Sequence, residues 1–280
     1  MLIKTFSSIA AAIRKVFANW SALLLMAIVY VALLVTLYFF VAVREASIAQ
    51  VTLTFALALI APVLFFLLQA MIANGSSGDA EPVSAGALAK SSLTSFWKFV
   101  VITLPLIALA VLVIYLLAKY QSHLAASSDS ATQLHPMASS RTRGTARAPI
   151  NWKSAALSTI RYLALGLVLP LAAIHLWLAT ARDGLFAAIK RIGQLLARAF
   201  APQSVLIYVV GFLVFAVVPY FLLFRTTPNK HAWLEIVLLA IRLAAVFALT
   251  LLGWVVTVKA IALLNFKADE LPEPATNEAA

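Results

Sequence analysis

The chain contains no cysteine and few charged residues, and these two absences already narrow its class. With no cysteine among its 280 residues, it has no disulfide framework, no thiolate nucleophile and no cysteine-based metal site. Charged residues make up 11% of the sequence, whereas soluble domains carry roughly 25%. Hydrophobic residues make up 64%, more than a water-soluble globule can bury, so the composition indicates a membrane protein.

Short motifs of the common enzyme classes are missing as well. The sequence has no GxxxxGK[ST] phosphate-binding loop, no HExxH zinc motif and no GxSxG nucleophile elbow. We therefore expect a protein that is not an enzyme, with no catalytic residue, no bound metal and no cofactor. Glu235 is the only carboxylate within a predicted apolar block, which also lowers the expectation of an ion-coupled carrier.

The charges leave long apolar stretches between them. Five pairs of charges enclose such stretches: Lys15 and Arg44, Glu45 and Asp79, Lys98 and Lys119, Arg161 and Arg182, and Arg198 and Arg225. Each stretch has room for about 20 apolar residues, and a helix of that length crosses a hydrocarbon core of roughly 30 Å. A sixth, shorter stretch lies between Arg242 and Lys259, whose long side chains would complete the crossing by reaching outward.

These stretches predict an all-α fold, a polytopic transmembrane helical bundle with six spans. They show no alternation of apolar and polar residues, which excludes a transmembrane β-barrel. We expect three spans in a first half, residues 21–118, and three in a second half, residues 159–266. The polar loop 119–158 and the acidic tail 267–280 are expected to be disordered, because their composition cannot bury a core.

Two basic amphipathic helices are expected at the membrane interface, one over residues 1–20 and one over 183–201. The apolar stripe of the first consists of Leu2, Phe6, Ile9, Ile13, Phe17 and Trp20. The stripe of the second consists of Leu185, Ile189, Ile192, Leu196 and Phe200. Because the basic residues flank apolar segments, we assign the net charge of +11 to contact with the lipid bilayer and its anionic headgroups, and not to nucleic acid.

Arg242, Glu235 and His175 are the candidate binding residues. An arginine near mid-bilayer costs at least ~2.5 kcal/mol on insertion scales and invites a partner. Glu235 lies two helical turns earlier, about 10 Å along the axis, where it could line one polar cavity with Arg242. Alternatively, Arg242 and Lys259 are simply the interfacial ends of the sixth span. His175 could titrate in a proton path, or serve a structural role beside Trp177.

Two functions fit this sequence. The first is a non-enzymatic scaffold, assembly or regulatory component of a bacterial inner membrane, packed against other membrane proteins. The alternative is a permease or a membrane subunit of a transport complex, with a path lined by Arg242, Glu235 and proline-broken helices. Prolines fall inside the second to fifth spans, at Pro62, Pro105, Pro170 and Pro219, although they are also common in membrane helices without transport roles. A membrane enzyme acting on lipid is a third, weaker hypothesis.

The distribution of basic residues predicts that both termini are cytoplasmic. Eleven basic residues then lie inside: Lys4, Arg14, Lys15, Lys90, Lys98, Arg182, Lys190, Arg191, Arg198, Lys259 and Lys267. Eight lie outside: Arg44, Lys119, Arg141, Arg143, Arg147, Lys153, Arg225 and Lys230. Three of the outer arginines belong to the long loop, far from any span end, where the positive-inside rule weakens.

A reporter fusion at Ala280 tests this orientation. A reporter that is active only in the periplasm is expected to stay inactive there, because an even number of spans returns the chain to its starting side. The same reporter placed within residues 119–158 is expected to be active. Periplasmic activity at Ala280 would contradict the topology.

Overall fold

The structure, a computed structural model, describes residues 2–43, 47–77, 84–132, 152–225 and 232–269. Every regular element within these residues is a helix, which confirms the all-α class. Six segments are long and apolar enough to cross a membrane: Trp20–Ala42, Ile48–Ser77, Ala85–Ser122, Ala155–Asp183, Pro202–Phe224 and Trp233–Asn265. The predicted six-span helical architecture is therefore confirmed.

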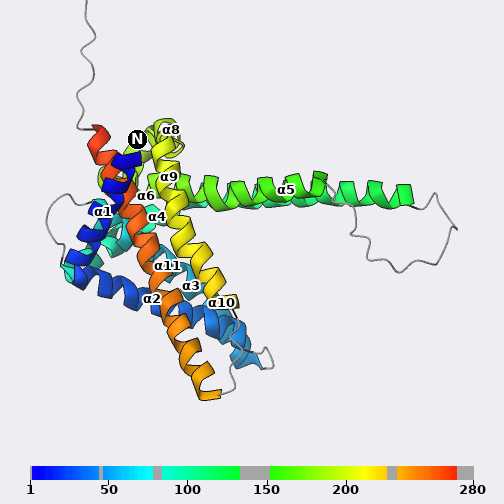
Figure 1. Cartoon of the computed structure of the whole chain (residues 1–280), viewed down its shortest axis with the longest axis horizontal. Helices are drawn as coiled ribbons and strands as arrows, with labels where there is room; N and C mark the ends of the chain where they lie inside the picture. The colour runs from blue at the N-terminus through cyan, green and yellow to red at the C-terminus, as the bar shows by residue number, and fades with distance from the viewer. Residues whose placement is uncertain (1, 44–46, 78–83, 133–151, 226–231, 270–280) are drawn as a thin grey trace, which may run out of the picture. The chain divides into compact units, whose positions relative to one another are not determined.

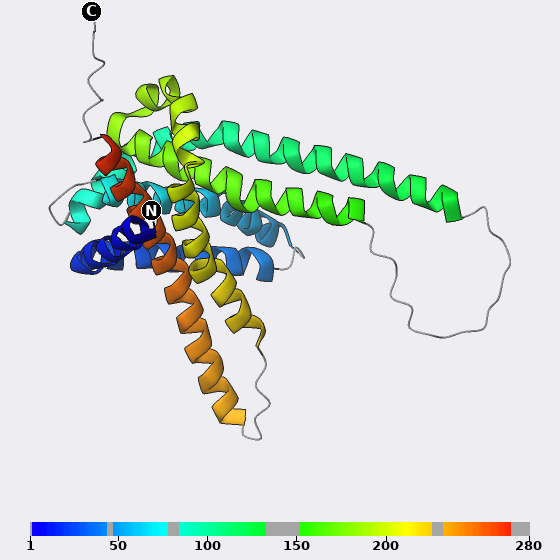
Figure 2. The same ribbon diagram turned by 45° about the horizontal axis from the view of Figure 1, so that its top comes forward.

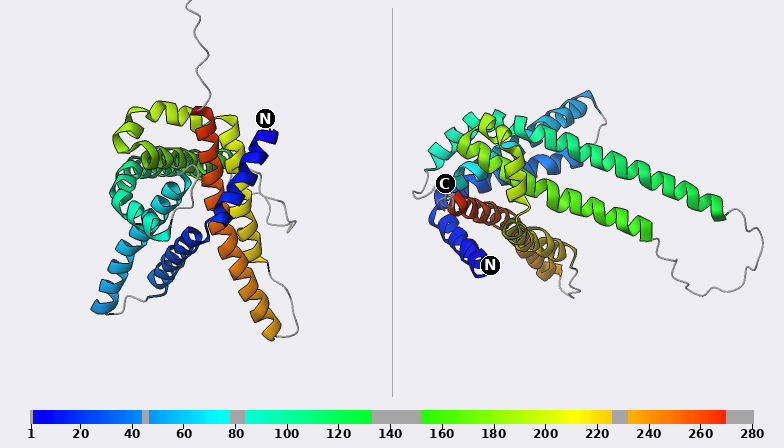
Figure 3. Two further views of the ribbon diagram at one scale, coloured as in Figure 1. Left: turned by 90° about the vertical axis from the view of Figure 1, so that its left-hand side faces the viewer. Right: turned by 90° about the horizontal axis from the view of Figure 1, so that it is seen from above.

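The described helices form two compact units, residues 1–102 with 174–280, and residues 103–173. The larger unit is arranged around α11 (Ala232–Asp269), drawn in orange to red in Figure 1. Helix α11 packs against α1 (Leu2–Ala18), α3 (Ile48–Ser77), α9 (Pro202–Phe212), η2 (Leu213–Val217) and α10 (Val218–Phe224). Helix α2 (Trp20–Ala42) packs against α3, and both views of Figure 3 show α1 beside α11.

The smaller unit contains most of α4 (Ala85–Thr132), α5 (Trp152–Leu163), η1 (Ala164–Val168) and the first residues of α6 (Leu169–Asp183). Figure 2 shows that α5 runs antiparallel to the later part of α4. Helix α4 reaches into the predicted disordered loop 119–158 and includes its first residues, 119–132. The loop's last residues, 152–158, belong to α5. Residues 133–151 and 270–280 lie outside the described residues.

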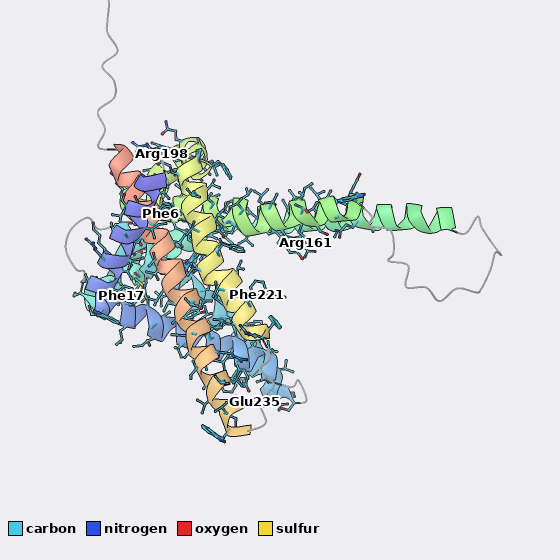
Figure 4. All side chains as sticks on the ribbon, in the orientation of Figure 1. Phe6, Phe17, Arg161, Arg198, Phe221 and Glu235 are labelled. Carbon is cyan, nitrogen blue, oxygen red and sulfur yellow. The ribbon has the colours of Figure 1, made fainter. Side chains whose placement is uncertain are left out.

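Helix α1 packs one face on α11, while Ile9, Ile13 and Phe17 of the predicted stripe line an apolar groove with α9 and α11. Thr5, Ala12 and Val16 are buried, whereas Phe6 of the predicted stripe is 59% exposed (Figure 4). Asn19 separates α1 from α2, because its side-chain oxygen accepts a hydrogen bond from the Ala22 amide at 3.4 Å and caps the new helix. The predicted stripe suits an apolar environment, and its place in the membrane interface stays a prediction.

Polar side chains inside the larger unit connect one helix to another. The Tyr30 hydroxyl lies 2.7 Å from Thr250 Oγ1, which joins α2 to α11. The Trp254 indole donates to Gln69 Oε1 at 3.0 Å, which joins α11 to α3. Such bonds stabilise membrane helices because lipid offers no competing partner.

A π turn precedes the proline in two of the spans. The proline ring clashes with the carbonyl four residues earlier, which belongs to Gly166 for Pro170 and to Phe215 for Pro219. Both carbonyls lie inside π turns, η1 and η2, where hydrogen bonds reach five residues back and the helix is wider. The prolines of the second and third spans instead lie within continuous α-helix.

Two glycines let α11 approach α9 and η2 closely. A Cβ added at Gly253 would lie 2.8 Å from the Phe215 Cβ and 3.3 Å from the Phe215 backbone nitrogen. A Cβ added at Gly211 would lie 2.9 Å from the Thr257 Cγ2. Close contact of this kind is typical of membrane helices, whose association depends on van der Waals packing.

We expect the substitution Gly253→Ala to destabilise the bundle by about 1–3 kcal/mol, the usual cost of overpacking. The added methyl meets the Phe215 backbone, which no rotamer change can move away. Gly86→Ala is the control, because a Cβ there has nothing within 4 Å. Thermal unfolding in detergent, followed by tryptophan fluorescence, should show a lower Tm for Gly253→Ala alone; equal Tm values would contradict the close contact.

Candidate functional site

A basic cavity of about 220 Å³ lies at one end of the larger unit. Its walls come from the C-terminal parts of α6 and α11 and from two short helices, α7 (Leu185–Lys190) and α8 (Ile192–Ala199). The charged and polar residues that line it are chiefly Arg182, Asp183, Arg191, Arg198, His175 and Asn265. Figure 4 labels Arg198 at this end, beside the start of α9.

Two breaks in the chain build the cavity wall. Gly184 ends α6 with φ 86, a backbone conformation that is strained for any residue with a side chain. Arg191, with φ −103 and ψ 16, separates α7 from α8. The segment predicted as one amphipathic helix over 183–201 is helical but consists of two short helices, α7 and α8, joined by a turn at Arg191.

These breaks bring three charges together at the cavity mouth. Asp183 Oδ1 lies 3.7 Å from Arg182 Nε, and Asp183 Oδ2 lies 3.9 Å from Arg191 Nη1. The side chains of Arg182 and Arg191 are 42% and 66% exposed, so solvent screens both pairs and each contributes little to stability. The main effect of this arrangement is the positive electrostatic potential that the arginines produce at the opening of the cavity.

The inner wall is neutral and polar. His175 is 1% exposed, and its Nδ1 lies 3.4 Å from the amide nitrogen of Asn265. The Nε2 atom of His175 is buried and has no hydrogen-bond partner among the described residues. A buried polar atom without a partner normally costs about 1–3 kcal/mol, so an acceptor that reached this atom would be stabilising.

Lys259 lies outside this cavity and does not reach outward as predicted. It is 6% exposed, and its Nζ donates to the carbonyl oxygens of Gly75 at 3.3 Å and Ser76 at 3.0 Å. These carbonyls belong to the last described turn of α3. The ammonium group therefore holds α11 against the end of α3.

The structure does not bring the three predicted site residues together. The Arg242 guanidinium donates to the carbonyl oxygen of Arg225, the residue that ends α10. Glu235 is exposed near the start of α11, and Figure 4 shows it at the opposite end of the larger unit from Arg198. Only His175 lines the basic cavity.

Sequence reasoning missed the arginines and Asn265 as site residues. The sequence around Gly184 carries a signal for them, because Arg182 and Asp183 directly precede a residue that can reverse the chain. Within the described residues, no three His, Asp or Glu side chains gather to hold a metal ion. Comparison of the chain with family models, curated proteins and solved structures finds no match.

Two glycine substitutions in the segment that connects α6, α7 and α8 are expected to change stability in opposite directions. Gly184→Ala should destabilise by about 1–3 kcal/mol, because alanine is strained at a φ of 86. Gly193→Ala should stabilise by about 0.5–1 kcal/mol, because alanine favours the helix α8 and its Cβ meets nothing within 4 Å. Thermal unfolding in detergent measures both, and a Gly184→Ala Tm at or above that of the unmodified chain would contradict the turn.

Proposed function

We propose that the chain is a non-enzymatic component of a bacterial inner membrane, acting as a scaffold, assembly factor or regulatory subunit. The observation that carries this proposal is the use of the polar side chains within the spans. Gln69, Tyr30 and Lys259 each bond to a neighbouring helix, and so does Asn74, whose amide donates to Ser95 at 2.9 Å. Side chains that hold helices together are the minimum that a structural component needs.

The outer faces of α10 and α11 support a role embedded among lipids and partner spans. Phe221 and Ile236 are both 67% exposed, and Phe221 is labelled on α10 in Figure 4. Apolar side chains at this exposure would be a liability in water but match the acyl chains or helices of a membrane. Within this proposal, the basic amphipathic segments contact anionic headgroups on the cytoplasmic side.

A membrane subunit of a transport complex is the second candidate, favoured by the π turns η1 and η2. Each lies inside a span and ends two residues before a proline, and interrupted spans are the places where transporters bend or bind substrate. The predicted polar path lined by Arg242 and Glu235 does not support this transport role. Arg242 bonds to the end of α10, and Glu235 is exposed.

Extraction of the full chain from native membranes into polymer-bounded lipid discs distinguishes these functions. Native mass spectrometry is expected to show the 30.2 kDa chain together with a second membrane protein at a fixed ratio, because a scaffold is held by its partner spans. A parallel sample, purified and reconstituted alone in liposomes, is expected to show no saturable solute uptake. A lone chain that takes up solute would refute the scaffold and assign the chain to transport.

A further inference from the structure

The geometry points to a binding site for a phosphate group in the basic cavity between α6, α7, α8 and α11. The group belongs either to a lipid headgroup with a terminal phosphate or to a small soluble phosphate. Such a site goes beyond the general contact with anionic headgroups proposed above, and it rests on the cavity alone. A phosphate site is compatible with both functions, that of a scaffold and that of a transport subunit.

Charge is the first reason for assigning a phosphate. Among the described residues, the cavity is lined by Arg182, Arg191 and Arg198 and by one carboxylate, that of Asp183, so these lining side chains carry an excess of two positive charges. A phosphate monoester carries about −1.5 to −2 at neutral pH and matches that excess. Guanidinium groups are also the side chains best shaped for phosphate, because their planar N–H donors bind two oxygens at once.

The buried donor of His175 is the second reason. The Asn265 amide nitrogen can only donate, so Nδ1 of His175 accepts, and the ring hydrogen is on Nε2. Protonation of the ring would leave a hydrogen on Nε2 as well. This N–H is buried in a residue that lines the cavity, and it has no acceptor among the described residues. A phosphate oxygen is an acceptor of the required kind.

Volume and surroundings fit the same ligand. The cavity of about 220 Å³ holds a phosphate group with several waters, yet it is too small for a large substrate. Beside it, α7 exposes Phe186 by 80% and Ile189 by 46%. If this apolar face lies among acyl chains, the cavity opens at the depth of lipid phosphates.

The chain offers a matched pair of variants on adjacent residues. Arg191→Gln removes a positive charge that lines the cavity, whereas Lys190→Gln removes the same charge from the exposed end of α7 outside the lining. We expect Arg191→Gln to weaken phosphate binding by about tenfold or more, since hydrogen bonds to charged groups contribute about 1.5–3 kcal/mol. Lys190→Gln should change the affinity less than about twofold, because an exposed charge outside the cavity is screened. Asp183→Asn should tighten binding by removing a like charge.

Two measurements on the full chain separate the two sources of phosphate. In discs of phosphatidylcholine alone, inorganic phosphate is titrated by calorimetry. In discs that also contain phosphatidic acid, native mass spectrometry counts the phosphatidic acid retained by each chain. The phosphate titration is then repeated in the discs that contain phosphatidic acid. If saturable binding of inorganic phosphate persists there, the ligand is a soluble phosphate. If retained phosphatidic acid abolishes that binding, the ligand is a lipid headgroup.

The variants decide whether the cavity is the site at all. Binding in either measurement that is weakened by Arg191→Gln and spared by Lys190→Gln supports the assignment. Absence of saturable binding in both, or equal weakening by the two variants, overturns it. Tryptophan fluorescence of each variant checks that the fold is retained, which is expected because both side chains are exposed.

Discussion

Cations inside a membrane and carbonyls at helix ends both lack partners, and α11 brings the two together. A lysine or arginine within the bilayer costs at least ~2.5–3.5 kcal/mol on insertion scales, and the last carbonyls of a helix have no donor within it. Lys259 donates to the final turn of α3, and Arg242 donates to the Arg225 carbonyl at the end of α10. Each bond gives a cation an acceptor and a carbonyl a donor, and each positive charge lies near the C-terminal end of a helix, where the dipole is negative.

These two bonds determine how α11 lies along its neighbours. Arg242 and Lys259 are seventeen residues apart, which is about 25 Å of helix, so the ends of α10 and α3 are held that far apart along it. Thr250 and Trp254 fall between them and bond to α2 and α3. A shift of α11 by one turn, about 5.4 Å, would break all of these bonds together. It would also move Asn265 away from His175, so the cavity depends on the same register.

The span positions could be predicted from the sequence, whereas the packing could not. Gaps between charges locate the spans because a charge is costly in lipid whatever surrounds it. In a soluble helix an apolar face also shows which side packs, but a helix such as α2 is apolar all round, since lipid and neighbouring helices are equally apolar. The partner of Lys259 and the turn at Arg191 depend on that packing. Of the residues that line the cavity, only His175 could be predicted as a candidate site residue from the sequence, because a histidine within a span is unusual whatever its neighbours.

One set of charges near the cavity can serve two purposes. Arg182, Arg191 and Arg198 contribute to the expected cytoplasmic excess of basic residues, and the same side chains line the cavity. Counting charges treats such arginines as equivalent to Lys190, because orientation depends on their number and not on where they point. The fold separates them. The turns at Gly184 and Arg191 direct some charges to a cavity lined by His175, whose buried Nε2 has no partner among the residues that the structure describes, and leave Lys190 on the surface. A basic residue beside a span is thus a candidate ligand when it shares a cavity with such a buried group.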